Sequence, residues 1–541
     1  MLLDATIVRL HPVDDHRDIL PDPADDPVEC LQLTADQVRD RIYRVNCDSS
    51  SGSTGWTNAL LRRLCDDRSG TAARIADTPP LPIHLSLTSF FNKMLRGAIT
   101  GEGRELLVGA RLIMIPKGTN AYRPIRIECA IMRLFGAAAC DQARLQVAPF
   151  LRPHQVGGGL KGGVEFGARL LDIGYNQGDT IISIDVENAF NSTRHLNIFQ
   201  EIIDKAPNLA RIFRWKYGTP SSMRDNAGAI VAHTCTGVGQ GDPFSSVFFE
   251  LALQPILLRL TEKVRAFERA YDVLHPESPI VRPDLVIAYE DDTTIRGEMA
   301  IMYDVAPYIA PIFEAYGFVV KVEKSFITGK DTDIMPDAPE DFAISAEGIV
   351  ALGVPIGSRN YILDKTTELL SQMHPPKDAL TLLTPRTALL LLLKCFNPRP
   401  GFLMRTAADY TLLRPAAAAF DTAITDCILS ILTLPPSEKL KSQIFFPRRL
   451  GGLGFMRHDG IASEESQLIS RLSFQNFLAT TYPIDFQYTQ QHLLPYWNPI
   501  RLGDSEDLTD HTGITPDIIA SMTHISARST LSTGTKAAQK V

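Results

Sequence analysis

Residues 288–295 (AYEDDTTI) place three consecutive acids, Glu290, Asp291 and Asp292, inside an apolar stretch with the pattern of a β-hairpin. Adjacent carboxylates repel one another, and removing them from water is costly unless a cation or hydrogen bonds compensate. These acids therefore lie either in a solvated turn or beside a positive charge. Few chain arrangements satisfy the second condition.

The order of the predicted elements favours the second alternative, in which the acids lie beside a positive charge. An apolar run at 180–184 ends at Asp185, and the pattern continues as helix, helix, hairpin, helix and strand. This order is close to the split β-α-β arrangement of a ferredoxin-like unit. In that arrangement the strand that ends at Asp185 lies beside the hairpin that carries Asp291 and Asp292. Carboxylates gathered in this way would bind two Mg²⁺ ions, with Mn²⁺ as the other candidate metal.

The mixture of helical and strand patterns along the chain indicates an α+β fold. The length of 541 residues suggests three or four subdomains, and the hydrophobic content of 45% indicates a sizeable core. The net charge of -8 argues mildly against a nucleic-acid partner. Residues 1–50 are acidic, however, whereas residues 101–126 and 386–450 carry net charges of +3 and +5. Because a polyanion contacts a local surface, these two basic segments matter more than the sum for the whole chain.

The eight cysteines show no metal-site or disulfide spacing, which favours a reduced, intracellular compartment. Asp4 interrupts the apolar run that a signal peptide needs, so we expect no secretion. No stretch reaches the roughly 18 apolar residues of a membrane helix. We therefore expect no membrane partner.

Several short motifs follow one another along the chain. They read SIDVENAF, TGVGQGDPFSSVFFELAL, AYEDD, GFVVKVEKS and LGVPIG, with IPKGTNAYRPIRI before them and GGLGF after them. In this order and spacing they resemble the palm motifs of reverse transcriptases, and they are most similar to those of non-LTR retrotransposons. The resemblance covers roughly residues 85–460. It implies a right-hand polymerase with fingers, a ferredoxin-like palm and a helical thumb.

The resemblance also assigns roles to single residues. Asp185 and Asp291 match metal ligands, together with the Val186 carbonyl, and Asp292 matches the second acid of the hairpin. The remaining matches are the triphosphate-clamping Lys117 and Arg123, the aromatic steric gate Phe190, the nucleotide-contacting Gln240 and Gly241, the proton-donor candidate Lys324, and the primer grip at Leu352, Gly353 and Pro355.

Each assignment has a structural alternative. Asp291 and Asp292 could be a solvated turn, Asp185 a helix cap and Phe190 a core residue. Gln240 could lie in a simple tight turn, and the basic residues could be solvated surface charges. Glu290 matches no acid in similar enzymes, and we expect its carboxylate to lie near the primer end and not to be a third ligand. On that basis Glu290→Ala would raise activity.

The resemblance implies an RNA-directed DNA polymerase that extends a DNA primer on an RNA template with dNTPs, in a nuclear location. The alternatives are a catalytically impaired RNA-binding protein and an RNA-directed RNA polymerase, which Phe190 disfavours because similar RNA polymerases carry an acid there. The predicted divisions are an acidic extension (1–84), fingers (85–180), palm (181–358), thumb (359–460) and a helical C-terminal region with a tail (461–541). We expect no zinc knuckles, RNase H domain or endonuclease.

Overall fold

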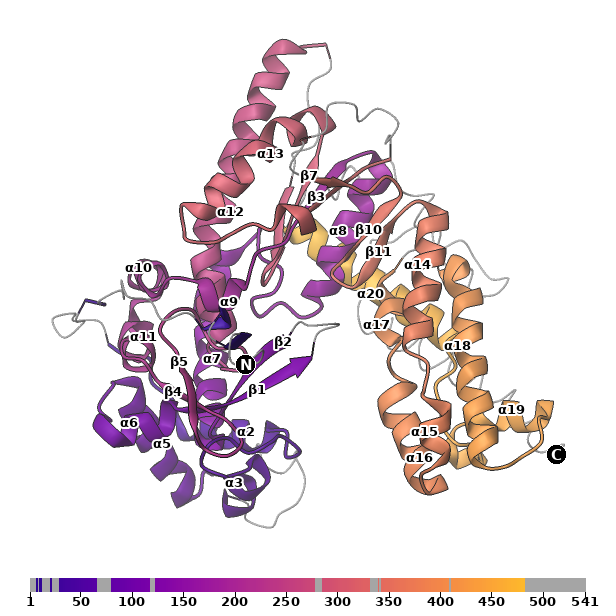
Figure 1. Cartoon of the computed structure of the whole chain (residues 1–541), viewed down its shortest axis with the longest axis horizontal. Coiled ribbons are helices and arrows are strands. Elements are labelled where there is room, and N and C mark those ends of the chain that lie inside the picture. Colours follow the sequence, from indigo (N-terminus) through magenta and orange to yellow (C-terminus); the bar gives the residue numbers. More distant parts are fainter. Residues whose placement is uncertain are drawn as a thin grey trace.

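The computed structural model describes residues 6–7, 9–11, 20–21, 29–65, 79–116, 122–277, 285–330, 339, 342–407 and 410–481. The chain has a mixed α+β architecture, as predicted. Figure 1 shows most of the first 150 residues on the lower left, the long helices α12 and α13 at the top, and most of the segment from 359 to 445 as a helical arm on the right.

A five-stranded sheet forms the centre of the fold. Its strands are β3 (Thr180–Ile184), β6 (Leu285–Tyr289), β7 (Asp292–Gly297), β8 (Phe326–Thr328) and β9 (Ala343–Ile344). Their order across the sheet is β6-β7-β3-β8-β9, and all neighbours are antiparallel except β8 and β9. The first four strands have the order expected for a split β-α-β unit, which confirms that prediction.

Three helices cover this sheet. They are α8 (Gly163–Gln177), α12 (Ser245–Leu274) and α13 (Met299–Glu314). The first half of α12 is buried nearly all round, and its phenylalanines Phe248 and Phe249 belong to the main hydrophobic core. A helix that is apolar on every face has to lie inside the protein, which fixes α12 as the central helix.

A second, four-stranded sheet lies beside the first. Its strands are β1 (Ala110–Pro116), β2 (Tyr122–Glu128), β4 (Ser222–Arg224) and β5 (Ile230–His233), in the order β2-β1-β4-β5. The β1–β2 hairpin was expected, and its tip at residues 117–121 lies outside the described residues. The short strands β4 and β5 carry no clear alternation of apolar and polar residues, and the sequence did not reveal them. Although they fall between residues 181 and 358, they complete the sheet of the preceding hairpin.

Further helices belong to the first half of the chain. They are α2 (Ala35–Arg44), α3 (Asn58–Cys65), α5 (Pro82–Leu95), α6 (Gly101–Val108), α7 (Ala130–Leu151), α9 (Ala189–Ser192), α10 (His195–Lys205) and α11 (Ala210–Tyr217). Helix α2 starts with a capping box, in which Thr34 and Gln37 each accept a hydrogen bond from the backbone N–H of the other. Helices α2 and α3 pack on α5 and α7, so this part of the acidic extension shares the main core.

The helical arm begins after the hairpin of β10 (Gly348–Ala351) and β11 (Val354–Gly357). Its helices are α14 (Arg359–Gln372), α15 (Lys377–Thr381), α16 (Pro385–Leu391), α17 (Gly401–Thr406), α18 (Tyr410–Ile431) and α19 (Glu438–Phe445). Helix α20 (Ile461–Thr481) then returns to pack on α8, where Phe474 and Phe477 contact Phe166.

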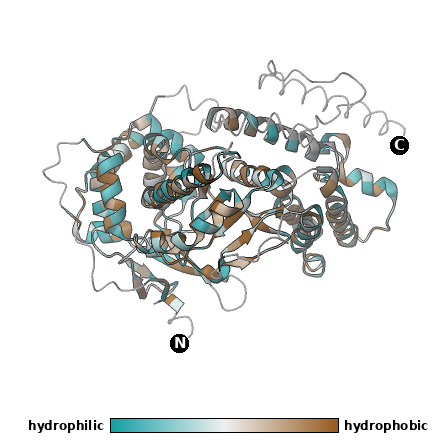
Figure 2. Ribbon diagram, turned by 90° about the horizontal axis from the view of Figure 1, so that it is seen from above, coloured by the Kyte–Doolittle hydropathy of each residue, from teal (hydrophilic) through white to brown (hydrophobic). Residues whose placement is uncertain are grey.

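The hydropathy pattern follows this arrangement. Figure 2 shows brown, apolar strands in the middle of the molecule and helices with teal, polar faces around them. Within the part of the chain that the structure describes, every helix is too short or too polar to cross a bilayer.

Candidate active site

Asp185 and Asp292 lie at facing positions on neighbouring strands. Ile184 of β3 pairs with Thr293 of β7, so one further step of the antiparallel register places Asp185 opposite Asp292. Residues at facing positions have Cα atoms about 5 Å apart. Asp291 occupies the two-residue turn between β6 and β7, and all three aspartates are exposed. The structure therefore brings the three predicted carboxylates to the same side of the sheet's strand ends, where β3 ends and β7 begins.

The backbone around Asp185 is held by the segment that precedes β8. The Lys321 N–H donates to the Asp185 carbonyl at 2.8 Å, and the Asp185 N–H donates to Ser325 Oγ at 3.0 Å. Val186 forms a bridge with Val320. These contacts fix the direction in which the chain leaves β3, and with it the position of the Asp185 carboxylate.

Carboxylates and a backbone carbonyl are the hard oxygen donors that Mg²⁺ prefers, so the donor set at Asp185, Val186 and Asp291 fits that metal chemically. Among the described residues, however, no three His, Cys, Asp or Glu side chains gather closely enough to hold a metal ion by themselves. Substrate phosphates commonly supply further ligands to Mg²⁺.

The two lysines next to this edge differ in position. Lys324 ends a short 3-10 turn and is exposed to solvent. The backbone of Lys321 is hydrogen-bonded directly to Asp185. The Lys321 ammonium group forms an ion pair with Glu187 at 3.0 Å. The motif pointed to Lys324 and overlooked Lys321.

The turn at Gln240 is pressed against strand β2. The Arg126 N–H donates to the Gln240 carbonyl at 2.7 Å. A Cβ atom at Gly239 would lie 2.5 Å from Arg126 Cδ, and one at Gly241 would lie 2.5 Å from the Arg126 carbonyl oxygen. Gly241 also has a φ of +104°, where a side chain would be strained. Only glycine allows this close approach, which places Gln240 beside β2.

Arg123 is exposed on β2, on the face of the strand opposite to buried Arg126. A solvent-exposed guanidinium at this place can contact a phosphate with two donors. Lys117, its predicted partner, lies outside the described residues.

The Phe190 ring is largely buried, with 8% of its surface exposed. It stacks on Phe249 of α12 with ring centroids 4.3 Å apart. The Phe190 carbonyl accepts from the Val238 N–H at 2.7 Å, which ties α9 to the segment before Gln240. Phe190 is thus part of the core. Its backbone hydrogen bond with Val238 also connects the motif that contains Asp185 with the motif that contains Gln240.

Leu352 and Gly353 form the two-residue turn of the β10–β11 hairpin, and Pro355 is buried in β11. Both turn residues have positive φ values, +53° and +76°, as a tight hairpin with a type I′ turn requires. The Leu352 side chain packs in the apolar cluster between α8 and the helical arm. This predicted group therefore lies at the junction with the helical arm.

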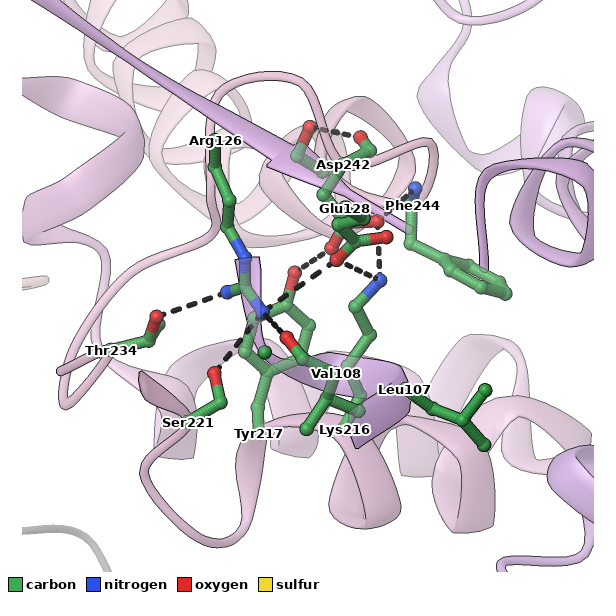
Figure 3. Close-up of polar contacts among 12 residues, drawn as sticks. Leu107, Val108, Arg126, Glu128, Lys216, Tyr217, Ser221, Thr234, Asp242 and Phe244 are labelled. Atoms are coloured by element: carbon green, nitrogen blue, oxygen red, sulfur yellow. Dashed lines mark hydrogen bonds and ion pairs between the residues drawn. The ribbon is translucent and has the colours of Figure 1, made fainter. Parts of the chain in front are cut away.

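A buried cluster of charges joins strand β2, helix α11 and the segment just before α12 (Figure 3). Lys216 of α11 forms ion pairs with Glu128 of β2 at 2.9 Å and with Asp242, just before α12, at 2.6 Å. Arg126 lies 3.6 Å from Glu128 and donates to Ser221, Thr234 and the Val108 carbonyl. All four charged side chains are almost completely buried.

The cluster is balanced, because two cations face two carboxylates. Burial, followed by the charge of Asp242, raises the pKa of Glu128, while Lys216 and Arg126 lower it. Burial and Asp242 also raise the pKa of Tyr217 well above its usual value, so its hydroxyl stays protonated and donates to Asp242. Asp242 in addition accepts from the Phe244 N–H at 2.9 Å and so anchors the start of α12.

Sequence reasoning missed Arg126, Glu128, Lys216 and Asp242, although three of them flank or lie in predicted motifs. Acids and bases at these positions have the same local pattern as surface charges. Arg126 and Glu128 do alternate with Ile125 and Ile127 along the predicted strand, but that alternation does not tell which face is buried.

We expect Lys216→Met to destabilise the protein by about 3 kcal/mol, because it leaves Glu128 and Asp242 buried without their shared cation. Urea unfolding followed by tryptophan fluorescence measures this, since Trp215 is the neighbouring residue. Lys441→Met is the matched control, because its ion pair with Glu438 is exposed and contributes about 0.5 kcal/mol. Equal effects of both substitutions would contradict a structural role for the cluster.

Comparison with known proteins adds one relative. The chain is 20% identical over 478 residues to the retrotransposable element SLACS 132 kDa protein of Trypanosoma brucei gambiense. The match covers 84% of this chain and 36% of the relative, so the chain spans about a third of that protein.

No family model matches the chain. Among solved structures, telomerase from Candida albicans, in a complex with a fragment of telomeric RNA, aligns with a TM-score of 0.33 and 10% identity, over 61% of this chain and 60% of that one. This structural likeness is too slight to support an argument. The motifs and the retrotransposon relative agree, and the chain resembles the reverse transcriptase domain of non-LTR retrotransposons.

Proposed function

We propose that this chain is an RNA-directed DNA polymerase that extends a DNA primer on an RNA template by adding dNTPs. The observation that carries the proposal is the strand register, which places Asp185 opposite Asp292, with Asp291 in the adjoining turn. Exposed carboxylates held at neighbouring strand ends are what two-metal nucleotidyl transfer requires. The resemblance to retrotransposon enzymes supports the choice of reaction and of a nuclear site of action.

In this proposal the chain is a right-hand polymerase. The β1–β2 hairpin and α7 belong to fingers at 85–180, the five-stranded sheet to a palm at 181–358, and the helical arm to a thumb at 359–460. The segments 1–84 and 461–541 flank this unit. The basic stretch 386–450 would grip the nucleic-acid backbone through phosphate contacts, which weaken as salt rises.

Asp185, Asp291 and the Val186 carbonyl would hold two Mg²⁺ ions, with Asp292 next to them. When bound, the ions would activate the primer 3′-hydroxyl and neutralise the charge that develops on the phosphate. The chain itself fixes the positions of the carboxylates. Backbone hydrogen bonds on either side of Asp185 fix one carboxylate, and the tight β6–β7 turn fixes the other.

Other residues would bind the substrates. Exposed Arg123 would contact the triphosphate, with Lys117, and the Gln240–Gly241 turn would face the incoming nucleotide. Phe190 would exclude a ribose 2′-hydroxyl, and Lys324 would donate a proton to pyrophosphate. Leu352, Gly353 and Pro355 would grip the primer strand near the junction with the arm.

We expect Asp291→Asn to lower primer extension by about 100-fold or more, because it removes charge where the metals would bind. The assay is extension of oligo(dT) on poly(rA) with dTTP and Mg²⁺. Asn is nearly isosteric with Asp, and position 291 is exposed, so folding should be preserved. Asp304→Asn, an exposed acid on α13, is the control and should leave extension unchanged. Equal background extension by wild type and Asp291→Asn would overturn the enzymatic proposal and leave an RNA-binding protein.

Phe190→Ala tests the sugar selection and separates a gate from a core residue. A gate predicts that incorporation of ribonucleotides rises by about tenfold relative to deoxyribonucleotides, a shift of roughly 1.4 kcal/mol in discrimination. A purely structural ring predicts only a loss of stability of about 3 kcal/mol or more.

Phe249→Ala is the matched control for this test, because it removes the partner of the same ring stack from a fully buried position. It should lower the melting temperature without changing the ratio of the two nucleotide types. If both variants leave that ratio unchanged, Phe190 is not the gate.

A further inference from the structure

Glu290, the acid without a counterpart in similar enzymes, is anchored on helix α12. Ser246, in the first turn of α12, donates through Oγ to Glu290 Oε1 at 2.9 Å. Glu290 is half-buried and has a φ of +53°, a strained conformation for a residue other than glycine. This side chain therefore faces the helix, whereas Asp291 is exposed to solvent.

Glu250 lies one turn further along α12 and faces the same place. Only 2% of its surface is exposed, and its Oε2 atom has no hydrogen-bond partner. Ser246 and Glu250 are four residues apart, so they share one face of the helix. Glu250 and Glu290 thus lie near one another behind the turn of the β6–β7 hairpin, close enough for the charge of Glu290 to act on Glu250.

The backbone around Glu250 is shaped to admit this group. A Cβ atom at Gly157 would lie 3.1 Å from Glu250 Oε1 and 3.7 Å from the Glu290 nitrogen, and one at Gly158 would lie 2.9 Å from Glu250 Oε2. The segment is fixed from two sides. Val156 N–H donates to the Ala288 carbonyl at 2.9 Å, and the Gln155 amide donates to the Glu250 carbonyl at 2.7 Å.

Charges from each surrounding element act on Glu250. Glu290 and Tyr289 face it from the hairpin, Arg144 from α7, and Arg152 from the residues that follow α7. Arg152 also donates to the carbonyls of Gln155 and Gly158. Burial first, and then the charge of Glu290, raise the pKa of Glu250 to about 7, against the opposing effect of the two arginines.

We propose that Glu290, held on α12 by Ser246, is a positioning residue for the turn that carries Asp291, and that the buried Glu250 behind it keeps its proton in mildly acidic solution. A neutral carboxyl at Glu250 removes the repulsion between two acids in an enclosed place. The effect on catalysis rests on the proposed polymerase function, whereas the protonation of Glu250 does not.

The first test compares primer extension by Glu290→Ala, Glu290→Gln and wild type. Glu290→Ala should lower kcat by about tenfold or more, because the turn loses its anchor and the carboxylates shift. Glu290→Gln should restore most of kcat, since its amide oxygen still accepts from Ser246. The Kd for the template–primer should stay unchanged in both variants. A higher kcat in Glu290→Ala, with tighter primer binding, would overturn the proposal and favour the expectation from the sequence.

The second test needs no polymerase activity. The pKa of Glu250 in the native chain, about 7, lies above the ordinary value of about 4.3 expected in the unfolded chain. Stability therefore falls as the pH rises between these values, because the unfolded chain has already released the proton that the folded chain still holds. Glu250→Gln removes this effect, so its melting temperature should rise relative to wild type by several degrees from pH 5 to pH 8.

Glu262→Gln, an exposed position further along α12, is the control, and its melting curve should stay parallel to that of wild type. Parallel curves for Glu250→Gln and wild type would overturn the protonation of Glu250. Should wild type itself fail to extend a primer, the proposed function is wrong, while the melting experiment still decides the state of Glu250.

Discussion

Two cations and two carboxylates, Arg126, Lys216, Glu128 and Asp242, are buried together where β2, α11 and the start of α12 meet (Figure 3). Removing any one of them would leave an uncompensated charge away from water, which is costly. The three elements therefore have one favourable arrangement. Because Gly239 and Gly241 allow contact with β2, that arrangement also sets the position of Gln240.

The start of α12 links this cluster to the edge that carries the aspartates. Asp242 anchors the first turn of the helix on the side of the four-stranded sheet. Four residues later, Ser246 holds Glu290 on the side of the central sheet. One helix end thus carries contacts to both the predicted nucleotide turn and the β6–β7 hairpin. Since α12 is packed on almost every face in its first half, it is a rigid support for both.

Sequence reasoning was most successful where the pattern is local. The hairpins around residues 117–121, 290–291 and 352–353, the helices α2 and α7, and the strand that ends at Asp185 were all expected, and the structure contains them. Periodicity of apolar residues and turn chemistry reveal such elements without knowledge of their neighbours. The short strands β4 and β5 escaped because pairing with β1, and not a local pattern, makes them strands.

What the sequence by itself determined is the kind of chemistry available: paired acids after apolar runs, glycines around Gln240, and an order of motifs that resembles reverse transcriptases. Only the tertiary structure decided that Asp185 faces Asp292, that Lys216 is buried between two acids, and that Glu290 turns to Ser246. The physical reason is that register and side-chain direction depend on contacts between segments that are distant in the sequence, 26 residues apart for Lys216 and Asp242 and 44 for Ser246 and Glu290. A single acid has the same local appearance whether it binds a metal, pairs with a lysine or anchors a turn.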